Sequence, residues 1–125
     1  MSYKSLYIDF LMQAEKKSVH GLSEKIKAEC QNLLERIVIA DSMGMALTVS
    51  QAMRLAHIAS PSTLHRRLDF LQSEKLIDLV FHGVNRRTKY LVPLPRTDRY
   101  LAHMGQLIQE AVDRHERTAQ KKPPD

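Results

Sequence analysis

The sequence predicts a mainly helical α+β fold, in which amphipathic helices surround one β-hairpin. Apolar residues recur at spacings of three and four through most of the 125-residue chain, which is typical of amphipathic helices. Around residues 77–92 the spacing changes to alternation on either side of a turn, which indicates two paired strands. The composition, 43% hydrophobic and 26% charged, is that of a globular protein that buries its own core.

Two helices are expected at the N-terminal end. The first covers residues 3–16, whose apolar side chains form one stripe, and a glycine breaks the segment after it. Ser23 is the candidate N-cap of the second helix, which covers residues 24–43 and ends before Gly44. Cys30 lies on the apolar stripe of this second helix, so we expect a buried and inert thiol there.

A short strand and two further helices are expected next. Residues 45–48 fit a strand, and residues 49–56 form an apolar stripe of two turns with Thr48 or Ser50 as its N-cap. The longer helix that follows covers residues 60–73. Its start is well marked, because serine at the N-cap and proline at the first helical position are both favoured there.

The hairpin and a last helix complete the pattern. In residues 77–82 Ile77, Leu79 and Phe81 alternate with Asp78, Val80 and His82. Residues 83–87 contain the Gly and Asn of a turn, and residues 88–92 return as the partner strand. Prolines end that strand. Thr97 is expected to cap a final amphipathic helix over residues 97–118.

This order of elements is that of a winged helix-turn-helix, in which two helices joined by a short turn precede a two-stranded wing. Residues 1–118 are expected to form a single domain, since no internal repeat or linker interrupts them. Residues 3–43 would supply N-terminal helices, residues 47–96 the helix-turn-helix and wing, and residues 97–118 a C-terminal helix suited to dimerisation. Residues 119–125 lack apolar periodicity and are expected to form a disordered tail.

The positive charge of the chain is concentrated in its middle. The formal net charge is +5, and residues 50–100 hold all of the excess, with nine Lys and Arg against four Asp and Glu. Residues 1–49 carry six of each sign and residues 101–125 carry four of each. Such segregation is typical of a module that binds a polyanion such as nucleic acid.

On a helical wheel the helix over residues 60–73 has two different faces. Leu64, Leu68 and Leu71 share one face, which is expected to be buried. The opposite face and its flanks carry side chains suited to the major groove, namely Ser60, Ser62, Thr63, His65 and Arg66, with Arg67 toward the core side. Arg66 is suited to a guanine, whereas Ser60 and Ser62 suit phosphate oxygens.

The turn of the hairpin is expected to reach another part of the duplex. Asn85, Arg86 and Arg87 lie at its tip and Lys89 on the returning strand, placed for a neighbouring minor groove or for the backbone. Helix, hairpin and charge together predict sequence-specific binding of double-stranded DNA. The alternative is a winged-helix module that docks a protein partner within a replication or mobile-element assembly.

The stretch LTVSQAMRLAHIASPSTLHRRLDFLQSEKLIDLV, then an arginine-bearing turn, a strand and RTDRYLAHM, resembles the DNA-binding lobe of MarR-type winged-helix transcriptional regulators. The resemblance covers residues 47–104. It implies that DNA is contacted by Ser60, Ser62, Thr63 and Arg66, with Arg87 as the wing arginine. It also implies a homodimer held by its terminal helices, which would bind a palindromic site.

The sequence departs from that family at three places. Lys75 stands where the family usually has a glycine in a left-handed turn, Asn85 stands at the wing tip where aspartate is common, and one C-terminal helix stands where the family often has two. A lysine in the left-handed conformation costs about 1 kcal/mol. The conformation of the turn at Lys75 can therefore differ between this chain and the family.

Enzymatic activity, a metal site and a cofactor are not expected. The sequence has no Gly-rich phosphate loop, no Gly-x-Ser-x-Gly turn and no HExxH motif, and its six histidines are scattered without ligand spacing. No apolar run has the roughly 18 residues of a membrane span, and residues 1–20 lack the core of a signal peptide. We therefore expect a cytoplasmic protein without a membrane partner. The operator, the direction of regulation and a small-molecule effector stay open, the last without support in the sequence.

Overall fold

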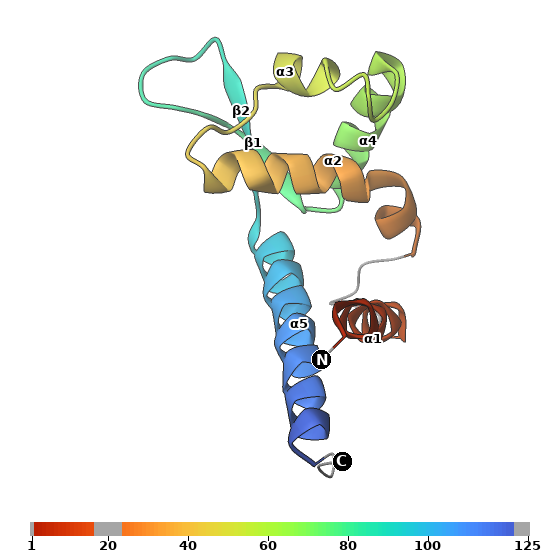
Figure 1. The fold of residues 1–125 in the computed structure, drawn as a ribbon. Coiled ribbons are helices and arrows are strands. Elements are labelled where there is room, and N and C mark those ends of the chain that lie inside the picture. Colours follow the sequence, from red (N-terminus) through yellow and green to blue (C-terminus); the bar gives the residue numbers. More distant parts are fainter. Residues whose placement is uncertain (1, 17–23, 122–125) are drawn as a thin grey trace. The chain divides into compact units, whose positions relative to one another are not determined.

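The structure is a computed structural model that describes residues 2–16 and 24–121. Figure 1 shows the elements in chain order, which are α1 (Tyr3–Lys16), α2 (Glu24–Ser42), α3 (Val49–Met53), α4 (Pro61–Ser73), β1 (Ile77–Phe81), β2 (Lys89–Pro93) and α5 (Pro95–Lys121). The expected mainly helical α+β class is confirmed, and the order of elements is winged-helix-like. The N-cap expected at Ser23 lies outside the described residues.

The chain divides into two compact units by its internal contacts, and the single domain expected over residues 1–118 stays a prediction. Unit 1 consists of Met1–Gly21 with Arg99–Asp125, and unit 2 of Leu22–Asp98. Each unit has buried apolar side chains of its own. The helix-turn-helix and the hairpin both belong to unit 2, so the candidate site lies within one unit.

The core of unit 2 is formed by one face of α2 against α4 and β2. Leu33 and Ile37 of α2, Leu64 of α4 and Leu91 of β2 are among its fully buried side chains. Burying a leucine or isoleucine side chain contributes about 1.5–3 kcal/mol. This apolar face fixes α4, so the position of the candidate recognition helix is set by packing rather than by its own propensity.

The hairpin is antiparallel, with Ile77 opposite Pro93 and Phe81 opposite Lys89. The expected strand over residues 45–48 is wrong. Only an isolated bridge between Thr48 and Tyr90 forms there, and the N–H of Leu91 donates to the carbonyl of Leu47 at 2.8 Å. The pairing stops after this bridge because Thr48 already begins the cap of the next helix.

The helix α3 is shorter than expected and ends at Met53 rather than near residue 56. Its start is a capping box that identifies Thr48, not Ser50, as the N-cap. The hydroxyl of Thr48 accepts from the N–H of Gln51 at 3.1 Å, and the side-chain oxygen of Gln51 accepts from the N–H of Thr48 at 2.9 Å. These reciprocal bonds satisfy two backbone donors of the helix start.

The helix α4 begins and ends as a well-formed element. Ser60 is its N-cap, with Pro61 in the first helical turn, as the sequence predicted. At its end the N–H of Lys75 donates to Gln72 and the N–H of Leu76 to Leu71, both at 3.0 Å. This pair of bonds is a Schellman motif. Lys75 takes the left-handed position of that motif, with φ 58, so the turn keeps the conformation for which glycine is favoured.

Replacing Lys75 with glycine should therefore stabilise the protein. The substitution Lys75→Gly removes the Cβ strain of the left-handed conformation and should raise the free energy of unfolding by about 1 kcal/mol. Chemical denaturation measures this directly. Gln72→Gly is the matched control, since Gln72 has an exposed side chain in the last turn of α4. There a glycine should lower the free energy of unfolding by about 1 kcal/mol. A Lys75→Gly protein that unfolds at the same or a lower denaturant concentration contradicts the prediction.

The last helix, α5, begins at Pro95, so the expected cap at Thr97 is wrong. Thr97 is buried, and its hydroxyl donates to the carbonyl of Leu76 at 2.6 Å, which connects the helix start to the end of α4. The backbone N–H groups of Thr97 and Asp98 donate to the carbonyl of Leu94. Leu94 therefore occupies the position that we had assigned to Thr97.

The same helix continues further than expected at its C-terminal end. Residues 119–121, predicted to be disordered, are helical, whereas the rest of that predicted tail lies outside the described residues. Side-chain bonds support the preceding turns, since Gln109 donates to Asp113 at 2.9 Å and Thr118 to the carbonyl of Arg114 at 2.9 Å. Both bonds lie in the turns that precede residues 119–121.

In unit 1, α5 packs on α1, and an ion pair joins them. Arg114 donates from Nε and Nη2 to the two carboxylate oxygens of Asp9, at 3.0 and 2.8 Å. These hydrogen bonds hold the pKa of Asp9 below its ordinary value, because they favour the ionised carboxylate. The pair therefore stabilises this contact at neutral pH and is lost as the pH falls through the lowered pKa.

Candidate nucleic-acid interface

The two faces of α4 differ as the helical wheel predicted. Leu64, Leu68 and Leu71 are buried, whereas the candidate DNA-contacting residues lie on the surface. The exposed ones are Ser60, Ser62, His65 and Arg66, with Thr63 and Arg67 half-buried. The outward position of Arg66 and the flanking position of Arg67 are thus confirmed, and contact of either residue with DNA stays a prediction.

Hydrogen bonds already engage part of this polar face. The hydroxyl of Ser60 accepts from the N–H of Thr63 at 3.4 Å and donates to the Thr63 hydroxyl at 3.0 Å. His65 lies beside Asp69 one turn later, with Nδ1 3.2 Å from the carboxylate. Arg66 is therefore the residue of this face whose donors are best placed for a new partner, whereas Ser60 and Thr63 first serve the helix start.

Arg66 also borders a hollow of about 300 Å³ between α2 and α4. Its lining includes Glu29 and Cys30 of α2, and Arg67 and Phe70 of α4. Cys30 is only 1% exposed, so the expected burial of its thiol is confirmed. The arginine pair of α4 is thus next to a carboxylate-bearing helix as well as solvent.

Two cations of the hairpin lie over the ring of Phe81. The guanidinium carbon of Arg86 and the ammonium nitrogen of Lys89 lie 5.3 and 5.4 Å from the centroid of the Phe81 ring. A cation over the face of an aromatic ring is attracted by the ring quadrupole, by about 0.5–1 kcal/mol at exposed sites. His82 and Tyr90 stack nearly parallel with centroids 4.1 Å apart and brace the same end of the hairpin.

The turn between the strands is held by local bonds. Gly83 has φ 59, and the side-chain oxygen of Asn85 accepts from the N–H of Arg87 at 2.9 Å. This is an Asx-type turn, in which a short polar side chain replaces a backbone partner. Val84 is 98% exposed at the tip. The turn thus presents Arg86, Arg87 and an apolar residue to solvent.

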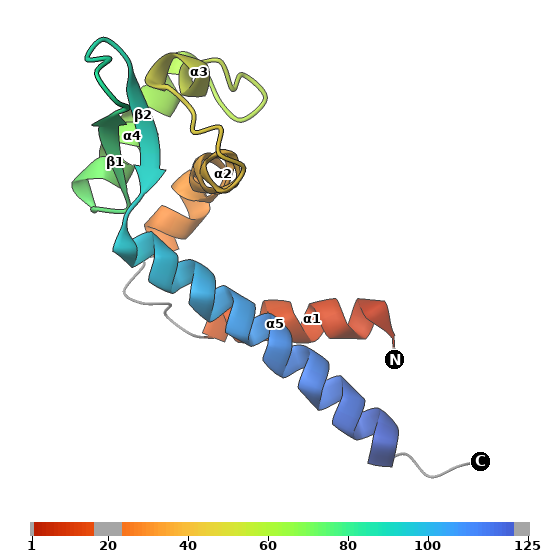
Figure 2. The same ribbon diagram turned by 90° about the vertical axis from the view of Figure 1, so that its left-hand side faces the viewer.

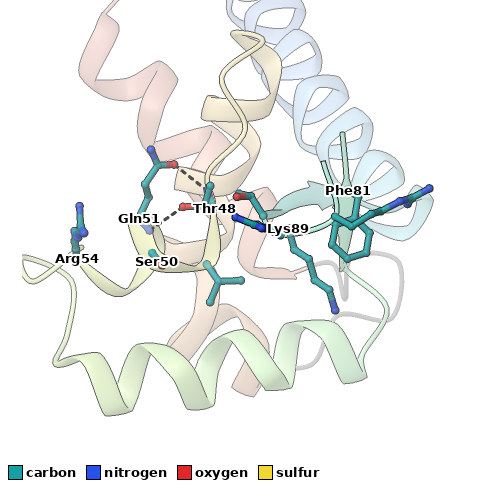
Figure 3. Close-up of a pocket in the computed structure, with 10 residues that line it drawn as sticks. Thr48, Ser50, Gln51, Arg54, Phe81 and Lys89 are labelled. Atoms are coloured by element: carbon teal, nitrogen blue, oxygen red, sulfur yellow. Dashed lines mark hydrogen bonds between the residues drawn. The ribbon is translucent and has the colours of Figure 1, made fainter. Parts of the chain in front are cut away.

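A second hollow, of about 570 Å³, lies between α3 and the hairpin, and Figure 3 shows the side chains that line it. Thr48, Gln51 and Arg54 lie on one side of the view, with Phe81 on the other. Four cationic side chains line this hollow, namely Arg54, Arg86, Arg87 and Lys89. It brings together residues that are more than thirty positions apart in the sequence.

Sequence reasoning missed Arg54. The only signal for it was the excess of basic residues between positions 50 and 100, because Arg54 falls after the end of α3 and on no periodic face. In Figures 1 and 2 the hairpin loop, α3 and the beginning of α4 lie along one side of unit 2. The second hollow therefore groups Arg54 with the predicted wing residues, whereas Arg66 and Arg67 of α4 border the first.

Comparison of the chain with protein-family models, with curated proteins and with solved structures found no match. Among residues 2–16 and 24–121, no group of three or more His, Cys, Asp or Glu side chains is arranged to hold a metal ion. None of the described helices has the length and apolar character needed to cross a membrane. The surface of unit 2 is the feature from which a function can be argued.

Proposed function

We propose that the protein is a sequence-specific, double-stranded DNA-binding transcriptional regulator. In this proposal α4 enters the major groove, and the wing over residues 83–89 contacts the neighbouring minor groove or the backbone. The observation that carries it is the exposed polar face of α4, opposite three buried leucines. The beginning of this helix lies on the same side of unit 2 as the hairpin loop (Figures 1 and 2). That the regulator is of the MarR type is proposed only from the sequence resemblance over residues 47–104.

The side chains of this surface divide into two roles. Arg66 is suited to read a guanine through two parallel hydrogen bonds, which discriminates against other bases by about 1–3 kcal/mol. Ser62, Arg86, Arg87 and Lys89 are suited to phosphate oxygens, which fix the position of the protein on the duplex without reading its sequence. Asn85 has its side-chain oxygen engaged in the turn, so it is proposed to shape the wing tip.

We also propose that the protein acts as a homodimer through its terminal helices. Tyr3, Leu6, Tyr7 and Phe10 of α1 line a hollow against α5, while Ile8, Leu11 and Met12 are exposed elsewhere on the same helix. Within its described residues α1 has no buried side chain. A helix that is apolar on several faces is normally buried. A second copy of unit 1 would bury this surface and set two copies of α4 on a palindromic site.

The second candidate function is a winged-helix module that docks a protein partner. The observation in its favour is Val84, whose apolar side chain is 98% exposed at the tip of the wing. Apolar residues at a projecting tip suit a pocket on another protein. This candidate predicts weak binding to every duplex alike, together with a partner contact that is lost in a Val84→Ser variant.

Selection of bound duplexes from a random pool tests the proposal. The full chain should enrich one motif, and a palindromic motif would support both sequence reading and two-fold symmetry. Affinity for the enriched duplex should fall steeply with salt, because phosphate contacts release counterions. Equal enrichment of all sequences would rule out the regulator and favour the docking module.

A further inference from the structure

We propose that the hollow between α3 and the hairpin is a binding site for backbone phosphates, with Arg54 on one wall and the wing cations on the other. The phosphates belong to the backbone of duplex DNA, so this inference rests on the proposed function and deepens it. It adds Arg54, a residue outside both the recognition helix and the wing, to the proposed DNA contacts.

The charge of the lining is the first reason. Arg54, Arg86, Arg87 and Lys89 line the hollow, and none of its lining residues, all within the described part of the chain, is acidic. Other arginines of the molecule have carboxylate partners, for example Arg96, whose Nη1 lies 3.2 Å from Glu74. Cations gathered without a carboxylate repel one another, and a bound anion removes that repulsion.

The rigidity of both walls is the second reason. On the α3 side the capping box fixes Thr48 and Gln51, and the N–H of Arg54 donates to the carbonyl of Gln51 at 3.1 Å. On the hairpin side Arg86 and Lys89 flank the ring of Phe81. The capping box on one side and the bond from the N–H of Arg87 to Asn85 on the other restrain the backbone, so less backbone freedom is lost when an anion binds.

Size and the remaining lining groups fit the same ligand. The hollow is open to solvent and has a volume of about 570 Å³, much more than one phosphate group occupies, so it can receive a stretch of sugar–phosphate backbone. Ser50 and Thr88 add hydroxyl groups to its wall. Hydroxyl and guanidinium donors are the usual partners of backbone phosphates in protein–DNA contacts.

The experiment compares two arginine variants of the full chain over a salt series. Arg54→Gln should weaken binding to all duplexes by a similar factor, about tenfold at low salt, and should reduce the slope of log affinity against log salt by about one. Arg36→Gln is the matched control, since Arg36 is exposed on α2, does not line the hollow and carries the same charge. The control should keep the wild-type slope.

A titration with inorganic pyrophosphate separates the sources of the phosphate. Amide NMR signals of the full chain are followed in wild type and in Arg54→Gln. If pyrophosphate shifts the signals around Arg54 and Lys89 in the wild type but not in Arg54→Gln, the phosphate site is supported. If the chain also binds no duplex, the ligand of the site is a free phosphate compound rather than DNA. A salt slope lowered only in Arg54→Gln supports the DNA backbone, whether or not the random pool yields a motif. If both arginine variants behave alike on DNA, and pyrophosphate shifts neither region, the proposal is overturned.

Discussion

Replacing Arg66 with alanine should reduce the preference for the selected duplex over single-mismatch duplexes by about 1–3 kcal/mol, which is roughly 5- to 150-fold. Arg66 is exposed on α4, and its guanidinium offers the two parallel donors that match the edge of a guanine. Competition binding with duplexes mutated one base pair at a time measures this loss. It should be confined to the position that the arginine reads.

Arg86→Ala is the control for this prediction, because it removes the same charge from the wing. It should weaken binding to matched and mismatched duplexes alike, since phosphate contacts carry no sequence information. Arg66→Ala should keep the wild-type free energy of unfolding within about 0.5 kcal/mol, because its side chain is exposed. Arg86→Ala should lower it by no more than about 1 kcal/mol, the value of the lost contact with the Phe81 ring. If the two variants lower affinity with the same dependence on sequence, the division between reading and positioning residues is wrong.

A charge pair placed on the exposed apolar face of α1 should convert the protein to a monomer. Ile8 and Met12, 44% and 49% exposed, are one turn apart and do not line the hollow against α5. The variant Ile8→Glu with Met12→Lys leaves the net charge unchanged, and its i, i+4 pair supports the helix. The monomer should bind a palindromic duplex about 100-fold or more weakly than the wild type, because the second half-site no longer adds to affinity.

Light scattering measures the oligomeric state, and circular dichroism checks that the helix content is preserved. Ser5→Ala, at an exposed polar position of the same helix, should remain dimeric. A charge-pair variant that is folded and still dimeric would place the interface elsewhere. A wild-type protein that is monomeric at the concentrations used for binding would contradict the homodimer itself.

Local chemistry made much of unit 2 predictable from sequence. The start of α4 follows from Ser60 and Pro61, and its buried face follows from the spacing of three leucines. The hairpin follows from alternation on both sides of a Gly-containing turn. These features depend on residues at most a few positions apart, so pattern reasoning reaches them.

Predictions failed where a residue had two possible partners. Thr48 was expected in a strand or at a cap, and it takes part in one bridge as well as in the capping box. Thr97 has the chemistry of an N-cap, but its hydroxyl donates to the carbonyl of Leu76. Lys75 keeps a glycine conformation, since the Schellman motif lets Leu71 and Leu76 both be buried. A contact with a distant segment decided the outcome at Thr97 and added the bridge at Thr48, whereas the bonds at Lys75 are local to the end of α4.

The sequence by itself determined the class of fold, the two faces of α4 and the concentration of positive charge in the middle of the chain. Only the tertiary structure decided that Arg54 lines the same hollow as Arg86, Arg87 and Lys89. The physical reason is the distance along the chain. The bridge between Thr48 and Tyr90 brings the start of α3 to the hairpin, and no periodicity in the sequence specifies a pairing over forty residues.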